Sequence, residues 1–173
     1  MGEPKQQPGR SKQDYQTPAT FIAAVKTRLG IDRFSHDFAA DASNKQAPTF
    51  FDEDTDALSV PRWELTLREC GAVWGWLNPP FSKIGPWAKR CAETCRAGGS
   101  IAFLVPAAVG SNWFRDHVDG QARVLFLNGR LAFMPDKPTW LYPKDCILVL
   151  YGPTVSPGYE VWTWRSQVRR AVA

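Results

Sequence analysis

The consecutive residues Asn78, Pro79, Pro80 and Phe81 supply the groups that chemistry on a planar amino group requires. An exocyclic amine on a purine is a weak nucleophile, because its lone pair is delocalised into the ring. Two acceptors that take hydrogen bonds from the amine draw it toward a tetrahedral geometry and localise that lone pair. The side-chain oxygen of Asn78 and the main-chain carbonyl of Pro79 are candidates for these acceptors. Phe81 is a candidate to stack on the base.

These four residues follow an apolar run, Val73–Leu77, which is typical of a buried strand. Two prolines end the strand, since neither can donate a hydrogen bond to a neighbouring strand. The amide and the ring are therefore expected at a rigid elbow, at the carboxyl end of a strand where open α/β sheets bind ligands. The alternative is a Pro-Pro loop that carries an exposed aromatic residue.

A helix is predicted near the start of the chain, with Thr17 as its N-cap and Pro18 at its first position. Apolar residues at helical spacing between Phe21 and Leu29 give it one buried face, and Gly30 ends it. This pattern is explained by a plain capped helix. It also leaves a helix N-terminus that suits an anion.

Two acidic segments follow this helix. The stretch from Phe34 to Asn44 begins as an alternating strand and ends in small and acidic residues, which include Asp37 and Asp41. A second segment carries an acidic cluster that ends at Asp56, shortly before Trp63. For all three aspartates the alternative is a solvated loop position.

Together these segments resemble the phage-type DNA N-6-adenine methyltransferase (Dam-like) family, from about Asp14 to Gly152. The resemblance implies an α/β, Rossmann-like S-adenosylmethionine-dependent methyltransferase fold in a single compact domain. It implies that Asn78, Pro79, Pro80 and Phe81 are catalytic. It also implies an enzyme that transfers a methyl group from S-adenosylmethionine to the 6-amino nitrogen of adenine in a short duplex DNA site.

The same resemblance assigns residues to the cofactor. Thr17 and Pro18 would face the methionine carboxylate, and Asp56 would accept a hydrogen bond from the adenosyl amino group. Asp37 is the first candidate and Asp41 the second for the ribose hydroxyls. The glycines usual in this loop are replaced by Ala39 and Ala40, of which Ala39 is included in the predicted site.

The block Leu127–Phe133 resembles the late Gly-Arg-x-x-Phe signature of the family. We expect a hairpin in which Val124–Leu127 and Leu131–Phe133 are paired strands around a tight turn at Asn128 and Gly129. Arg130 would then hold a phosphate and Phe133 would lie near the flipped base. The alternative is a hairpin with one exposed arginine and one core phenylalanine.

Further DNA contacts are assigned to Lys83, Lys137 and Trp140. No large insertion stands out as a target-recognition domain, so specificity is expected from short loops around Pro106–Asn112 and Pro135–Lys144. The recognised sequence cannot be read from these loops.

The length fits one domain. We assign residues 1–13 to a disordered basic head, 14–155 to the methyltransferase domain and 156–173 to a basic C-terminal tail. The remaining elements expected within the domain are a helix that ends near Ala97, a strand Ile101–Val105, a helix that opens at Trp113 and a strand Cys146–Tyr151.

The charge balance and the cysteines agree with what the resemblance implies. A net charge of +4 favours an acidic partner, although it is too small to decide one. The four cysteines lack metal-ligand spacing, so we expect free buried thiols and no metal. No signal peptide or membrane-spanning run is visible, which predicts a cytoplasmic protein with no membrane partner. We expect a phage- or prophage-encoded monomer or weak dimer that acts in the host cell on double-stranded DNA.

Two alternative functions stay open at this point. The Asn-Pro-Pro-aromatic motif also occurs in S-adenosylmethionine-dependent enzymes that methylate RNA bases or protein glutamine. A noncatalytic DNA-binding module is the other alternative, because the cofactor loop lacks its usual glycines.

Overall fold

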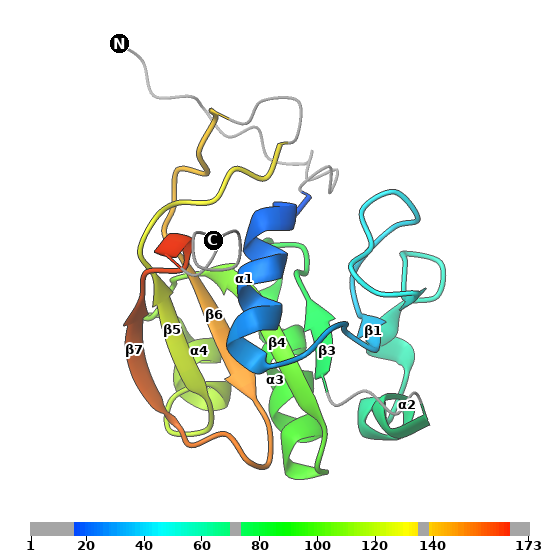
Figure 1. Ribbon diagram of the computed structural model, residues 1–173. Helices are drawn as coiled ribbons and strands as arrows, with labels where there is room; N and C mark the ends of the chain where they lie inside the picture. Colours follow the sequence, from blue (N-terminus) through cyan, green and yellow to red (C-terminus); the bar gives the residue numbers. More distant parts are fainter. Residues whose placement is uncertain (1–15, 70–73, 135–138, 167–173) are drawn as a thin grey trace.

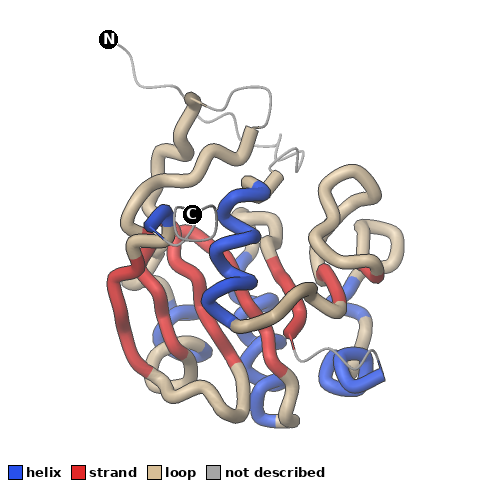
Figure 2. Tube along the Cα trace, in the orientation of Figure 1, coloured by secondary structure: helices blue, strands red, loops and turns tan. Residues whose placement is uncertain are grey.

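The computed structural model describes residues 16–69, 74–134 and 139–166 of the chain. Within these ranges the strands form a single sheet in the order β2-β1-β3-β4-β6-β5-β7 (Figures 1 and 2). The strands are β1 (His36–Asp37), β2 (Thr49–Phe50), β3 (Trp74–Leu77), β4 (Ser100–Pro106), β5 (Arg123–Leu127), β6 (Cys146–Tyr151) and β7 (Gly158–Trp162). The helices are α1 (Ala19–Leu29), the 3-10 turn η1 (Ala57–Ser59), α2 (Trp63–Glu69), α3 (Ile84–Arg96) and α4 (Asn112–His117).

The sheet is mixed. Strands β2, β1, β3 and β4 pair in parallel, whereas β6 runs antiparallel to its neighbours β4 and β5. Strand β7 pairs in parallel with β5 at the outer edge. The carboxyl ends of β1, β3 and β4 therefore meet at one edge of the sheet, which is where Asn78 follows β3.

Helices cover both faces of this sheet (Figure 2). On β4, Ala102 and Leu104 pack in the same cluster as the buried face of α1, whereas Ile101, Phe103 and Val105 pack with α3 and α4. Because both faces of β4 are buried, its sequence is an uninterrupted apolar run instead of an alternating one. Strand β3 is buried throughout for the same reason.

Most predicted elements are confirmed. Strands β3, β4 and β6 lie where the apolar runs placed them, and helices α3 and α4 follow as expected. Helix α1 buries Phe21, Ile22 and Val25 and ends at Gly30, whose φ of 66° is the left-handed conformation that closes a helix.

The predicted hairpin around Asn128 and Gly129 is wrong. Strand β5 ends at Leu127 and pairs with β6 and β7, and the segment that holds Leu131 and Phe133 is a loop. Leu131 and Phe133 are almost completely buried in the cluster that contains α1. Their apolar alternation reflects burial in this cluster. In the sequence, such a pattern cannot be distinguished from that of a half-buried strand.

Two local predictions near the start of the chain are also wrong. Helix α1 begins at Ala19 with Pro18 as its N-cap, so Thr17 lies outside the helix. The segment that begins at Phe34 forms a two-residue strand, β1, and residues 34–38 are all buried instead of alternating. In both cases contacts with distant segments override the local pattern.

Strand β7 was not expected. It lies within residues 156–173, which we assigned to a basic tail, yet it pairs with β5 from Gly158 to Trp162. Trp162 is only 3% exposed and packs in the α1 cluster. The sheet therefore extends past the boundary that composition suggested at residue 155.

None of the described helices has the length and apolar character of a membrane-crossing segment. Within the same ranges, no group of three or more His, Cys, Asp or Glu side chains is placed to hold a metal ion. Cys91, Cys95 and Cys146 are free thiols, and Cys95 is half-buried where we expected full burial.

Candidate active site

The elbow after β3 meets the start of α1. Asn78 donates a hydrogen bond from Nδ2 to Oγ1 of Thr17 at 3.1 Å, although 61 positions separate the two residues in the chain. A small cavity of about 10 Å³ lies here, lined among others by Thr17, Asp37, Ala39 and Asn78. Four predicted site residues, from three separate segments, are therefore in one place.

The hydrogen bond to Thr17 orients the amide of Asn78. Since Nδ2 faces Thr17, Oδ1 faces the other way, and this oxygen is buried without a hydrogen-bond partner among the described residues. A buried acceptor that lacks a donor costs free energy unless a ligand supplies one. The elbow therefore presents an oxygen that is ready to accept a hydrogen bond.

Phe81 lies in a cluster of three aromatic rings. Its ring centroid is 6.0 Å from that of Phe133 and 5.6 Å from that of Tyr142. Phe133 and Tyr142 also contact each other edge to face at 5.4 Å. Phe81 is half-buried, whereas Phe133 is fully buried, so Phe133 supports Phe81 and does not itself line an open space.

Asp37 ends β1 and braces the loop that follows. It is 2% exposed, and its carboxylate accepts hydrogen bonds from the backbone N–H groups of Ala39 at 3.2 Å and Gln46 at 2.9 Å. Burial raises the pKa of Asp37 to about 6, and these two hydrogen bonds oppose that shift. Its carboxylate oxygens are thus engaged by the protein's own backbone.

Asp41 and Asp56 are exposed and each organises its own turn. Asp41 accepts hydrogen bonds from Ser43 and Asn44, and the hydroxyl of Ser43 is the main cause that lowers the pKa of Asp41. Asp56 caps η1 by accepting from the backbone N–H of Leu58 at 3.1 Å. Its φ of 30° is unusual for a residue with a side chain and holds the acidic turn in a tight bend.

A cleft of about 620 Å³, which we call the acidic cleft, opens beside these aspartates. Its charged lining within the described ranges is entirely negative, and it consists of Asp41, Asp52, Glu53, Asp54 and Asp56. Ala39 and the catalytic candidate Pro80 also line it. Rings of Phe38, Phe51 and Trp87 form its apolar wall.

A second cleft of about 550 Å³, the basic cleft, lies at the start of α1. Thr17 and Pro18 line it, and the charged side chains that the structure describes there are all positive: Lys45, Arg130 and Arg165. Arg165 stacks on Trp164 at 5.1 Å and donates from Nη2 to the carbonyl oxygen of Arg130 at 3.1 Å. Nε of Arg130 contacts Oδ1 of Asp145 at 3.2 Å.

Asn44 lines both clefts and the small cavity between them. The site thus has an acidic compartment and a basic compartment that adjoin at Asn44, which also lines the cavity where Thr17 holds Asn78. The remaining DNA-contact candidates lie in different places: Lys83 is exposed at the start of α3, Trp140 is 41% exposed, and Lys137 falls outside the described residues.

Sequence reasoning missed Asn44, Lys45 and Leu141 as lining residues, and it expected from Arg165 only nonspecific phosphate contacts by a tail. A signal existed for Asn44, because its spacing of three from Asp41 is typical of a side-chain-closed turn. The other three reach the basic cleft from separate parts of the chain, which no local pattern reveals.

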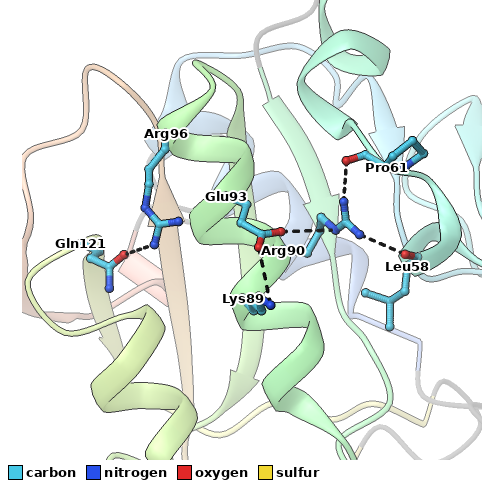
Figure 3. A network of polar contacts seen from close by, with 7 residues as sticks. All are labelled: Leu58, Pro61, Lys89, Arg90, Glu93, Arg96 and Gln121. Atoms are coloured by element: carbon cyan, nitrogen blue, oxygen red, sulfur yellow. Dashed lines mark hydrogen bonds and ion pairs between the residues drawn. The ribbon is translucent and has the colours of Figure 1, made fainter.

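Arg90 of α3 fixes the segment that follows Asp56 (Figure 3). Its guanidinium donates to the carbonyl oxygen of Pro61 at 2.6 Å and to that of Leu58 at 3.1 Å. Arg90 also lies 3.9 Å from the carboxylate of Glu93, which Lys89 approaches at the same distance. The rim of the acidic cleft is therefore tied to the long helix after the elbow.

Comparison with known proteins connects this site to a family. The sequence model of DNA N-6-adenine-methyltransferase (Dam) matches residues 5–160. A DNA N-6-adenine-methyltransferase of Escherichia phage T1 is 28% identical over 123 residues, which cover 68% of this chain and 46% of that protein. The chain thus spans about half the length of this curated relative. No solved structure matches the chain.

Replacing Asp37 with asparagine should change how stability depends on pH. The folded-state pKa of about 6 lies above the ordinary value of 3.8, so folding favours the protonated carboxyl. The stability it contributes is complete below about pH 4 and is lost as the pH rises through 6, by a total of order 3 kcal/mol. The amide of the variant cannot titrate. Urea unfolding between pH 4 and 7 should therefore show the wild type losing stability relative to Asp37→Asn, whereas parallel profiles would contradict the assignment.

Proposed function

Since the chain belongs to the DNA N-6-adenine-methyltransferase (Dam) family, we propose that it transfers a methyl group from S-adenosylmethionine to the 6-amino nitrogen of an adenine in duplex DNA. The observation that carries this proposal is the pair of oppositely charged clefts that share Asn44, which also lines the small cavity at Asn78 and Thr17. A cationic cofactor and a polyanionic substrate need such opposite surroundings on the two sides of one reaction centre. The sheet, with its one antiparallel strand β6, is consistent with a Rossmann-like methyltransferase fold.

The acidic cleft fits S-adenosylmethionine by its chemistry. The cofactor supplies, when bound, an electrophilic methyl group on a positively charged sulfur. Five carboxylates at the rim suit that positive charge, and the apolar wall suits the adenine ring. Asp56 and Asp41 are placed to accept hydrogen bonds from the adenosyl part, while Asp37 acts through the loop that it braces. The cofactor would reach from the acidic cleft to Thr17 and the start of α1, which line the basic cleft and suit its carboxylate.

Asn78 and Pro79 act on the target amine. Oδ1 of Asn78 and the carbonyl oxygen of Pro79 accept one hydrogen bond each from the 6-amino group of the flipped adenine. Both acceptors are rigid, because Thr17 orients the amide and the two prolines restrict the backbone. The two acceptors do not have to move as the lone pair of the amine localises. Their hydrogen bonds therefore stabilise the transition state without a cost of reorganisation.

Phe81 provides the surface on which the adenine stacks. Its contacts with Phe133 and Tyr142 fix the ring plane, so the base is held at the level of the elbow. Stacking of a base on an aromatic side chain is worth about 1–3 kcal/mol, which helps to offset the cost of flipping. The three positive side chains of the basic cleft favour a nucleic acid over a protein glutamine as the substrate.

The charge segregation can be tested with two matched substitutions. Asp56→Asn should weaken S-adenosylmethionine binding and leave DNA binding nearly unchanged, because it removes charge only from the acidic cleft. Arg130→Gln should do the reverse and lower the slope of log K for DNA against log salt by about 1. Calorimetry for the cofactor and fluorescence anisotropy for DNA measure the two affinities. Equal effects of either substitution on both ligands would contradict separate compartments.

The role of Asn78 is tested by Asn78→Ala. Removing one preorganised hydrogen-bonding group of this kind typically lowers the rate by about 10²–10³-fold. We expect such a loss in transfer of labelled methyl to unmethylated duplex DNA, with N-6-methyladenine as the wild-type product and cofactor affinity within about twofold. Asn128→Ala, the same change at an exposed turn, is the matched control. Transfer by Asn78→Ala at the wild-type rate would rule out the proposed mechanism.

A further inference from the structure

Two apolar side chains that are adjacent in the chain are exposed in the connection between β5 and β6. Trp140 is 41% exposed and Leu141 is 44% exposed. Large apolar side chains that stand together in solvent usually mark a contact surface. Of the two, Leu141 lines the basic cleft, together with Thr17 and Arg130.

Leu141 projects from a rigid base. The next residue, Tyr142, is 4% exposed, and its backbone N–H donates to the carbonyl oxygen of Leu131 at 2.8 Å. The Tyr142 ring contacts Phe81, whose role in the proposed function is to stack on the flipped adenine. Figure 1 shows the described parts of the connection between β5 and β6, residues 128–134 and 139–145, beyond the sheet on the same side as the start of α1. Leu141 is thus an exposed apolar side chain one residue away from direct contact with the catalytic elbow.

The charged side chains around Leu141 indicate which kind of molecule binds there. Positive side chains around an exposed apolar side chain favour a polyanionic partner over an uncharged protein surface. The charged groups that the structure describes in this cleft are Lys45, Arg130 and Arg165, which suit phosphates on both sides of an inserted side chain. Duplex DNA offers both features at once, a polyanionic backbone and an apolar interior between stacked bases.

Flipping an adenine out of a duplex leaves a gap in the stack and costs a few kcal/mol in lost stacking and pairing. Apolar side chains that enter such steps keep the neighbouring bases apart. We propose that Leu141 inserts into the duplex at the place that the target adenine leaves, and so stabilises the flipped state. This proposal rests on the proposed function, because it names a positioning residue for that reaction.

The proposal is tested with duplexes that contain the site methylated by the wild type, mapped first by locating N-6-methyladenine in its products. In one duplex, 2-aminopurine replaces the target adenine, since its fluorescence rises when it leaves the stack. The wild type should raise this fluorescence and Leu141→Ala should not. Leu141→Met, which keeps a side chain of similar volume, should restore the signal. Val161→Ala, a 68% exposed position on β7, is the matched control and should behave as the wild type.

A second duplex separates insertion from a general defect. Flipping costs least for a mispaired base. Leu141→Ala should therefore methylate a normally paired target about tenfold more slowly than the wild type or worse, and most of this loss should disappear when the target is mispaired. Cofactor affinity should stay unchanged, which also shows that the variant is folded.

Four results would overturn the proposal. An equal loss on paired and mispaired targets would show that Leu141 only shapes the cleft. A change of oligomeric state on Leu141→Ala, with normal flipping, would show that the patch binds a second copy of the chain. If the wild type binds the cofactor and DNA but methylates no adenine, the proposed function is refuted as well. If the wild type methylates adenine and Leu141→Ala flips the target normally, only the insertion is refuted.

Discussion

The hydrogen bond between Thr17 and Asn78 is the interaction on which the rest of the site depends. It joins the start of the first helix to the elbow after the central strand and turns the amide so that its oxygen is buried and unpaired in the described structure. An amide that could rotate would present its NH₂ group to an amine half of the time and repel it. The sheet also positions the site, since the pairing of β1 with β3 holds the ends of these two strands side by side.

Charge is distributed around this junction in a way that the net charge conceals. A total of +4 describes a mildly basic chain, yet the described carboxylates of one cleft and the described cations of the other are completely segregated. Asn44 lines both compartments, and Thr17 lines the basic cleft and the small cavity at Asn78. Arg90 lines neither cleft, yet it contacts the segment beside the acidic one. It holds the turn that carries Asp56 against α3 (Figure 3).

Much of this architecture could be predicted from the sequence. Long apolar runs identified β3, β4 and β6, and the Asn-Pro-Pro-Phe elbow lies at the carboxyl end of β3, as expected. The failures have a common physical cause. At each of these positions the side chain contacts a segment that is distant in the sequence, and local patterns do not reveal such contacts. The hydroxyl of Thr17 accepts a hydrogen bond from Asn78 instead of capping α1. Phe133 lies in a loop and packs against Phe81 instead of forming a strand. Lys45, Leu141 and Arg165 converge on one cleft only after folding.

The most direct measurement compares Thr17→Val with Thr17→Ser in single-turnover methyl transfer to DNA at saturating S-adenosylmethionine. Valine has nearly the shape of threonine but lacks the hydroxyl that accepts from Asn78, whereas serine keeps it. If the oriented amide is central, the valine variant should be slower by about tenfold or more, the equivalent of one hydrogen bond of about 1.4 kcal/mol, and the serine variant should stay close to the wild type. A valine variant that transfers methyl groups at the wild-type rate would contradict the account.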